Sequence, residues 1–274
     1  MIIAELSANH NQDKNLALET IKAAKKNGAD AIKIQTYTAD TMTIDSNAPE
    51  FIINNGSPWD GKNYYELYQQ AYTPWEWHQE LKEFAESLGL IFFSTPFDIT
   101  AVDFLEELDV PMYKIASFEI TDIPLISHIA KQNKPIIMST GIASEEDIDL
   151  AIKTIRKHSQ QSITLLQCTS SYPASIEDAN LSMIPALKKR FNVDVGLSDH
   201  TLGTLVPTAA AALGITVIEK HFILDRSLGG PDSGFSLEPE EFKQMVDAVR
   251  NVEKSLGKVD FTLTEKKQKN RIFS

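Results

Sequence analysis

Polar and ionisable side chains follow each of eight short apolar runs in the sequence. A lone Ser or Thr after an apolar run is normally only a cap for the next helix. Here every run delivers such groups, which predicts a shared site rather than eight unrelated caps. In chain order the groups are Glu5, Ser7, Asn9 and His10; Lys33 and Gln35; Ser94 and Thr95; Lys114, Ser117 and Glu119; Ser139, Thr140 and Gly141; Gln167, Ser170 and Tyr172; Ser198, Asp199 and His200; and Glu219, Lys220 and His221.

Two of these groups, Lys33 and Lys114, are cations placed within apolar runs, where a charge has to be paired. Several of the hydroxyl groups are expected nearby. Cations surrounded by neutral hydrogen-bond donors are typical of a cradle for phosphate or carboxylate. The alternative is a structural network in which Glu5, Glu119 and Glu219 neutralise the lysines, and both interpretations can hold together.

Two histidines, His200 and His221, follow neighbouring runs at equivalent positions, so their imidazoles are expected to approach each other. Two neutral imidazoles with open positions beside them favour a divalent-metal site of the Lewis-acid type. A lone histidine is more often a packing residue, and no third protein ligand is evident. We expect His78, His128 and His158 on solvated helix faces.

The elements that must position these groups alternate between short runs rich in Ile and Val and longer segments of helical period, the pattern of βα units. Eight units form either a closed barrel or a doubly wound sheet. The length of 274 residues is close to the ~250 typical of a barrel, so we predict a (β/α)8 TIM barrel over residues 1–256. In such a barrel the C-terminal ends of the strands carry the catalytic groups.

The strands are expected at Ile2 to Leu6, Ala31 to Gln35, Leu90 to Ser94, Met112 to Ala116, Ile136 to Ser139, Ile163 to Gln167, Val193 to Leu197 and Ile215 to Glu219. The helices are expected at Lys14 to Asn27, Trp75 to Leu88, Ile99 to Leu108, Ile123 to Lys131, Glu145 to His158, Leu181 to Phe191, Leu205 to Leu213 and Pro239 to Ser255.

Two segments do not fit this alternation. Residues 38–72 have little periodicity but hold several aromatic residues, which predicts an ordered loop packed over the top of the barrel, because long loops in compact domains are usually functional or disordered. Residues 257–274 are polar, basic in their centre and without a helical stripe, which predicts a linker.

The composition limits the class of protein. A formal net charge of -12 disfavours nucleic acid and anionic membranes as partners, because phosphate backbones are bound by an excess of Lys and Arg. The single cysteine, Cys168, permits no intrachain disulfide and has no evident activating partner. Neither a signal peptide nor a long apolar span is visible, so a cytoplasmic location is expected.

Sequence motifs from all eight predicted strands resemble the sialic acid (nonulosonate) synthase family. The motifs are "IAELSANH" (Ile3 to His10), "IKIQTYT" (Ile32 to Thr38), "FSTPF" (Phe93 to Phe97), "YKIASFE" (Tyr113 to Glu119), "STGIA" (Ser139 to Ala143), "CTSSYP" (Cys168 to Pro173), "GLSDHT" (Gly196 to Thr201) and "IEKHF" (Ile218 to Phe222). These enzymes condense phosphoenolpyruvate with an amino-sugar aldehyde. The resemblance implies a metal-polarised aldehyde, attack by the enol carbon, addition of water and release of phosphate by carbon–oxygen cleavage.

The resemblance also implies roles for individual residues. It assigns catalysis to Glu5, Lys114 and His221, and the divalent metal to His200 and His221. The metal is expected to be Mn²⁺, with Co²⁺ or Mg²⁺ as alternatives. It assigns sugar contacts to Asn9, Glu119, Tyr172 and Asp232. It assigns phosphoenolpyruvate binding to Lys33, Gln35, Thr95, Lys114, Ser117, Ser139, Ser170 and Ser198.

Within the family, "PWDGKNYYELY", "TPWEWH" and "GGPDSGFSLEP" are similar to the pseudaminic acid branch. The implied acceptor is 2,4-diacetamido-2,4,6-trideoxy-L-altrose. The alternatives are an N-acetylneuraminate or legionaminate synthase, or a non-catalytic barrel that binds sugar or phosphoenolpyruvate. Members of the family continue into a C-terminal antifreeze-like (SAF) domain and form homodimers. By resemblance that domain is absent here, and residues 257–274 are the linker toward it.

Overall fold

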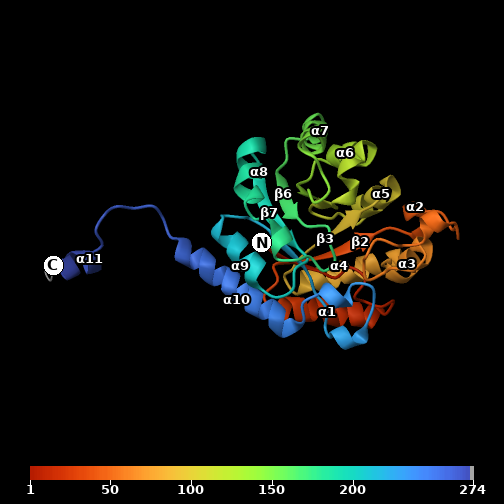
Figure 1. The fold of residues 1–274 in the computed structure, drawn as a ribbon, viewed down its shortest axis with the longest axis horizontal. Coiled ribbons are helices and arrows are strands. Elements are labelled where there is room, and N and C mark those ends of the chain that lie inside the picture. The colour runs from red at the N-terminus through yellow and green to blue at the C-terminus, as the bar shows by residue number, and fades with distance from the viewer. Residues whose placement is uncertain (272–274) are drawn as a thin grey trace.

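Eight parallel strands close into a barrel in the computed structural model, which describes residues 1–271 (Figure 1). The strands follow one another around the barrel in chain order, and the first pairs with the last. The predicted (β/α)8 TIM barrel is therefore confirmed. The strands are β1 (Ile2–Glu5), β2 (Ala31–Thr36), β3 (Ile91–Pro96), β4 (Tyr113–Ile115), β5 (Ile136–Ser139), β6 (Ile163–Cys168), β7 (Asp194–Asp199) and β8 (Ile218–His221).

Helices cover the outside of the barrel in the order that the sequence predicts. Their ends carry the expected signals: Asp13 and Asp98 accept hydrogen bonds from the first turns of their helices, and Ser144 forms a capping box with Asp147. The helices are α1 (Lys14–Lys26), α4 (His78–Ser87), α5 (Ile99–Glu107), α6 (Ile123–Lys131), α7 (Glu145–Arg156), α8 (Met183–Phe191), α9 (Leu205–Ala212) and α10 (Pro239–Leu256).

Side-chain alternation divides the strands into two apolar faces. The outward face packs against the helices in one large core that includes Ile32, Phe92 and Ile218. The inward face holds a smaller apolar cluster that fills the barrel toward the N-terminal ends of the strands. Its buried members are Ile3, Ala31, Phe93, Ile137, Leu166 and Val217. Above this cluster, the same inward face carries the polar groups singled out from the sequence.

The predicted insertion is ordered and lies over the C-terminal end of the barrel. It contains α2 (Ala39–Met42), a 3₁₀ turn (Pro49–Phe51) and α3 (Tyr64–Ala71). The ring of Tyr37 makes edge contacts with Tyr68 of α3 and with Phe97 after β3. Trp59 Nε1 donates a hydrogen bond to the carbonyl oxygen of Pro231, at 2.8 Å, so the insertion is joined to the loop after β8.

Two buried histidines hold the segment that leads out of the insertion. His10 accepts a hydrogen bond at Nδ1 from the Gln12 N–H, which leaves Nε2–H to donate to Thr73 Oγ1. His78 Nδ1–H donates to the Pro74 carbonyl oxygen, and its Nε2 accepts from Thr36 Oγ1. The expectation of a solvated His78 is wrong, because this helix face packs against the end of β2 and the side chain is fully buried.

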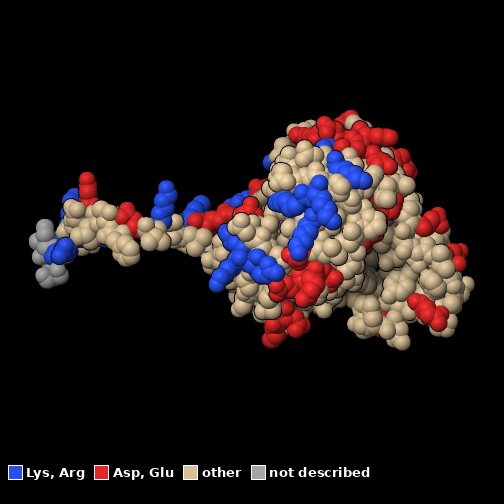
Figure 2. All heavy atoms as spheres, turned by 90° about the horizontal axis from the view of Figure 1, so that it is seen from above, with Lys and Arg blue, Asp and Glu red and all other residues tan. Residues whose placement is uncertain are grey.

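Residues 257–271 leave the barrel after α10 and extend away from it (Figure 1). They include the short helix α11 (Glu265–Asn270), and the side chains of Val259 and Phe261 are almost fully exposed. Residues 272–274 of the predicted linker lie outside the described residues, and the domain boundary after residue 256 stays a prediction. On the face shown in Figure 2, acidic and basic side chains are interspersed. Within residues 1–271, no helix combines the length and the apolar character needed to span a membrane.

The two buried histidines make stability depend on pH. Burial lowers the pKa of His10 and of His78 from 6.5 to about 4. The unfolded chain therefore binds more protons than the folded chain between these values, so their contribution is complete above pH 6.5 and is lost as the pH falls toward 4. We expect each histidine to lower the free energy of unfolding by about 1.4 kcal/mol per pH unit in that range.

Urea unfolding at a series of pH values from 7.5 to 4.5 measures this slope. His78→Gln is expected to reduce the slope, whereas His158→Gln, a change at an exposed histidine, is expected to leave it as it is. A slope that is the same in His78→Gln and in the unchanged protein would contradict the assignment.

Candidate active site

A cavity of about 710 Å³ opens at the C-terminal end of the barrel strands. This volume lies in the range of small-molecule sites. Part of its wall comes from the insertion, through side chains that include Met42, Ile53, Trp59, Leu67 and Tyr68. The rest comes from the ends of the strands and the loops after them, and seven residues predicted from the sequence line it: Ser7, Gln35, Glu119, Ser170, Tyr172, His221 and Asp232.

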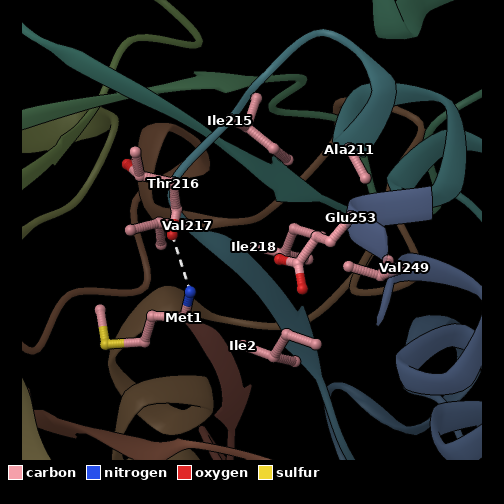
Figure 3. A pocket seen from close by; sticks show the side chains of 9 residues that line it. All are labelled: Met1, Ile2, Ala211, Ile215, Thr216, Val217, Ile218, Val249 and Glu253. Atoms are coloured by element: carbon pink, nitrogen blue, oxygen red, sulfur yellow. Dashed lines mark hydrogen bonds between the residues drawn. The ribbon is translucent and has the colours of Figure 1, made fainter. Parts of the chain in front are cut away.

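A second and much smaller cavity lies at the opposite end of the barrel. Figure 3 shows a small cavity there, between the start of β1 and the segment that leads into β8, where the Met1 amino group donates to the Thr216 carbonyl oxygen at 2.7 Å. Its volume is about 10 Å³, which is at the lower limit for a single water molecule. The cavity at the C-terminal end is therefore the candidate site.

Beneath the large cavity, Lys33 lies inside the barrel with its charge paired. Its Nζ is 2.7 Å from Glu5 Oε2 and donates to Thr95 Oγ1 at 3.0 Å. Gln35, one step closer to the cavity on the same strand, donates from Nε2 to Glu5 Oε1 at 3.2 Å and to Ser7 Oγ at 2.9 Å. The amide of Gln35 thus stands between the buried carboxyl group and the cavity.

The second lysine, Lys114, lies in the same layer and projects from β4, two strands away from Lys33. Its Nζ donates to Ser139 Oγ at 2.8 Å and lies 3.5 Å from Glu219 Oε1. Ser198 Oγ also donates to Glu219 Oε1, at 3.2 Å, and Lys33 Nζ is 3.9 Å from Glu219 Oε2. Glu219 therefore joins the two lysines. The sequence also offered a structural network in which Glu5, Glu119 and Glu219 neutralise the lysines; Glu5 and Glu219 take this part, whereas Glu119 lies above them in the cavity wall.

The buried carboxyl groups differ in their affinity for protons. Burial raises the pKa of Glu5 to about 7, against the opposing effect of Lys33. Burial also disfavours the ionised form of Glu219, but Lys114 and Lys33 outweigh it and hold the pKa of Glu219 below its ordinary value. Two carboxyl groups whose pKa values are pushed apart are typical of acid–base sites. At neutral pH, Glu219 stays ionised while Glu5 can give or accept a proton.

A group of small polar residues forms a hollow beside the lysines. Ser170 Oγ donates to Ser117 Oγ at 3.0 Å, and the Ile142 N–H donates to the same oxygen at 3.0 Å. Because Ser117 accepts both bonds, its own hydroxyl hydrogen is left to donate to a ligand. A Cβ at Gly141 would lie 2.4 Å from Ser170 Oγ and 2.9 Å from Ser117 Oγ, so any side chain here would displace these hydroxyls.

The two predicted metal ligands face each other, with imidazole centroids 5.4 Å apart. His200 Nδ1–H donates to the Thr169 carbonyl oxygen at 2.9 Å, which leaves Nε2 unprotonated in the neutral ring. Burial lowers the pKa of His200 to about 4 and moves the pKa of His221 in the same direction, so both rings are neutral at pH 7.

His221 Nδ1 is buried without a hydrogen-bond partner, and Asp232 Oδ2 lies 3.9 Å away. No group of three or more His, Cys, Asp or Glu side chains in the described chain could hold a metal ion. The two neutral imidazoles are fewer than the three protein ligands of a typical catalytic metal site, so a metal held by this pair would take its other ligands from water or substrate.

Aromatic side chains enclose the histidines. Tyr172 packs against His200 and Phe235 packs against His221, and Trp59 of the insertion contacts both Tyr172 and Phe235. The sequence marked Tyr172 but not Phe235 or Trp59. Trp59 belongs to the aromatic residues of the insertion, and Phe235 lies in the "GGPDSGFS" segment. The sequence did not predict that they meet, because more than 170 positions separate them.

The predicted sugar contacts separate into two groups. Glu119, Tyr172 and Asp232 line the cavity, and burial raises the pKa of Glu119 to about 7. Asn9 does not line it. Its side-chain amide donates to the Phe222 carbonyl oxygen and to Ser236 Oγ, which holds the loop after β8. Among the predicted ligands of phosphoenolpyruvate, Lys33, Thr95, Lys114, Ser139 and Ser198 lie in the layer beneath the cavity. Ser94, Asp199 and Lys220, which the sequence grouped with the site, point outward from the barrel.

Comparison with known proteins places these residues in a family. A model of the NeuB family matches residues 20–261. The chain belongs to the NeuB family. It is 52% identical over 273 residues to the pseudaminic acid synthase of Campylobacter jejuni, covering all of this chain and 79% of that protein. It is 51% identical to the pseudaminic acid synthase of Helicobacter pylori, covering 99% of this chain and 80% of that protein.

A solved structure has the same fold as this NeuB family member. It is N-acetylneuraminic acid synthetase from Leptospira borgpetersenii, in complex with citrate, at 34% identity and a TM-score of 0.88. The match covers 99% of this chain and 90% of that one. The resemblance to sialic acid synthases noted in the sequence is confirmed.

The hollow around Gly141 leads to a prediction. In Gly141→Ala the added methyl group displaces the Ser170 and Ser117 hydroxyls, so affinity for inorganic phosphate is expected to fall at least about tenfold, equivalent to roughly 1.4 kcal/mol. Isothermal titration calorimetry measures it. Gly234→Ala is the control, because a Cβ there would meet no atom within 4 Å. Equal affinities in Gly141→Ala and the unchanged protein would show that the hollow does not bind the anion.

Proposed function

We propose that this chain catalyses the pseudaminic acid synthase reaction, in which phosphoenolpyruvate, water and 2,4-diacetamido-2,4,6-trideoxy-L-altrose give pseudaminic acid and phosphate. The observation that carries the proposal is the 52% sequence identity to a pseudaminic acid synthase, which extends over all of this chain. The site supports it, because a buried pair of lysines lies directly beneath a cavity large enough for a sugar.

In this proposal the anionic substrate occupies the deep layer. Lys33 and Lys114 supply two positive charges there, and Glu219 balances one of them when ionised. With Glu5 protonated, the four groups carry one net positive charge, which favours an anion in a medium of low dielectric constant. The hydroxyls of Thr95, Ser117, Ser139, Ser170 and Ser198 add neutral donors for the phosphate and carboxylate oxygens.

Glu5 is the proposed acid–base group of the reaction. A carboxyl group with a pKa of about 7 changes its protonation state readily at neutral pH. The carbon–carbon bond forms between the enol carbon and the aldehyde carbon, water then adds to the resulting oxocarbenium centre, and the carbon–oxygen bond to phosphate breaks. Glu5 would exchange a proton with the aldehyde oxygen or with that water, while Gln35 orients the Glu5 carboxyl group.

His200 and His221 are the proposed ligands of a divalent metal, with Mn²⁺ expected and Co²⁺ or Mg²⁺ as alternatives. When bound, such an ion supplies Lewis-acid polarisation of the aldehyde oxygen. The contribution of the chain is to present two neutral imidazoles, with the His200 tautomer fixed by Thr169. The sugar would rest against Glu119, Tyr172 and Asp232 in the cavity above.

The acceptor is tested by phosphate release with phosphoenolpyruvate and Mn²⁺. We expect kcat/KM with the 6-deoxy altrose acceptor to exceed that with the acceptors of N-acetylneuraminate and legionaminate synthases by at least about tenfold, the size of discrimination that one substituent provides. A preference for either of those acceptors would reassign the product within the family.

The control for this assay uses a longer protein. Because the chain spans 79% of the Campylobacter relative, the assay is repeated with the C-terminal remainder of that protein fused to this chain. No phosphate release with any acceptor from either form, while metal is bound, would overturn the enzyme proposal in favour of a binding barrel.

The metal ligands are tested by binding. His200→Ala and His221→Ala are each expected to weaken Mn²⁺ binding more than the 10- to 100-fold that loss of an outer hydrogen-bond partner typically causes. Electron paramagnetic resonance of free Mn²⁺ measures the dissociation constants, and His158→Ala, at an exposed histidine, is the control. Unchanged Mn²⁺ binding in both variants would place the metal elsewhere.

A further inference from the structure

A buried ion pair lies on the outer face of the barrel, directly behind the two facing histidines. Lys220 Nζ is 2.6 Å from Asp199 Oδ2 and also donates to the Thr201 carbonyl oxygen. The Lys220 side chain is fully buried, and the Asp199 side chain is 2% exposed. Nothing in the proposed reaction uses this pair, because it is separated from the cavity by the wall of the barrel.

The position of the pair in the sheet is what makes it informative. Asp199 of β7 and Lys220 of β8 are register partners in neighbouring parallel strands. Each is followed by one of the histidines, and side-chain alternation turns His200 and His221 inward while the ion pair points outward. The ion pair therefore connects the two strands at the point from which both imidazoles project.

Asp199 also fixes the backbone on the far side of His200. Its Oδ1 accepts from the Thr201 N–H at 3.1 Å and from Thr201 Oγ1 at 2.8 Å. Lys220 Nζ therefore binds both neighbours of His200 in the chain: the side-chain carboxylate of Asp199 and the carbonyl oxygen of Thr201. The residues on both sides of His200 are thus bonded to each other and to Lys220, the residue that precedes His221.

Stability alone does not account for the pair. Apolar side chains of similar volume usually replace a buried ion pair without loss of stability, whereas an ion pair adds direction to a contact. The neighbouring outward position on β8, Ile218, is apolar and belongs to the outer core. An aliphatic residue at position 220 would continue that surface but would leave β7 and β8 without a directional link.

We propose that Asp199 and Lys220 are positioning residues that hold His200 and His221 as a facing pair. The role of this facing pair in metal binding rests on the proposed function, but the arrangement of the imidazoles does not. Loss of the pair would let the β7 loop move relative to β8, so that His200 no longer keeps its hydrogen bond to Thr169 and the distance between the two imidazoles varies.

The test uses the double variant Asp199→Asn, Lys220→Met, which removes both charges together and so leaves no buried charge unpaired. In the metal-free protein, ¹⁵N spectra of labelled histidine report the His200 tautomer. The unchanged protein is expected to show one Nδ1–H form, and the double variant a mixture of tautomers. The Mn²⁺ dissociation constant is expected to rise about 10- to 100-fold, as for other groups that orient metal ligands.

A matched control distinguishes positioning from a general effect on folding. Lys134 and Glu106 form another ion pair outside the barrel, at 2.9 Å, far along the chain from both histidines. The double variant Lys134→Met, Glu106→Gln is expected to keep the single tautomer and the Mn²⁺ affinity, whatever its melting temperature.

The tautomer readout decides the proposal even if the protein binds no metal. A double variant at 199 and 220 with a lower melting temperature but an unaltered His200 spectrum would overturn it, because the pair would then be structural only. If the unchanged protein shows the single tautomer but binds no Mn²⁺, the metal assignment fails and the positioning role is still judged from the spectra.

Discussion

Two lysines and two glutamates lie in one layer inside the barrel, and the rest of the site depends on how their charges are balanced there. An isolated charge there would be costly, so each lysine has a carboxylate partner and a hydroxyl partner. The apolar cluster beneath closes the barrel toward its N-terminal end, and the insertion covers the other end. Burial disfavours the ionised form of both glutamates, and the stronger effect of Lys114 and Lys33 on Glu219 is what separates its pKa from that of Glu5.

Much of this arrangement could be predicted from the sequence, because strands impose a period of two. That period puts Glu219 and His221 on one face of β8 and Lys220 on the other, and the structure shows that the first face is the inner one. The eight βα units limited the fold to two topologies. In a barrel the C-terminal ends of all strands lie at one end, so residues from Glu5 to His221 were expected close together. The motifs at the strand ends were sufficient to indicate the family.

The structure was needed where a contact joins elements that no local pattern relates. The sequence predicted a solvent-exposed helix face at His78. The packing of α4 against the end of β2 instead buries the His78 side chain against Thr36. Asn9 lies in a motif of the site, yet its amide holds the loop after β8. The bond from Trp59 to Pro231 and the role of Glu219 between both lysines depend on distances that periodicity does not encode.

The pairing of β1 with β8 has a consequence for how the protein acquires its activity. Glu5 and His221 are register partners across this seam, although 216 positions separate them in the chain. Contacts of such large sequence separation slow folding, because the entropy of closing a long loop is lost before the contact is made. The proposed acid–base group and one of the proposed metal ligands therefore meet only when the ring of strands closes. A ribosome-bound or proteolytically shortened chain that lacks β8 would hold the lysines but not a working site.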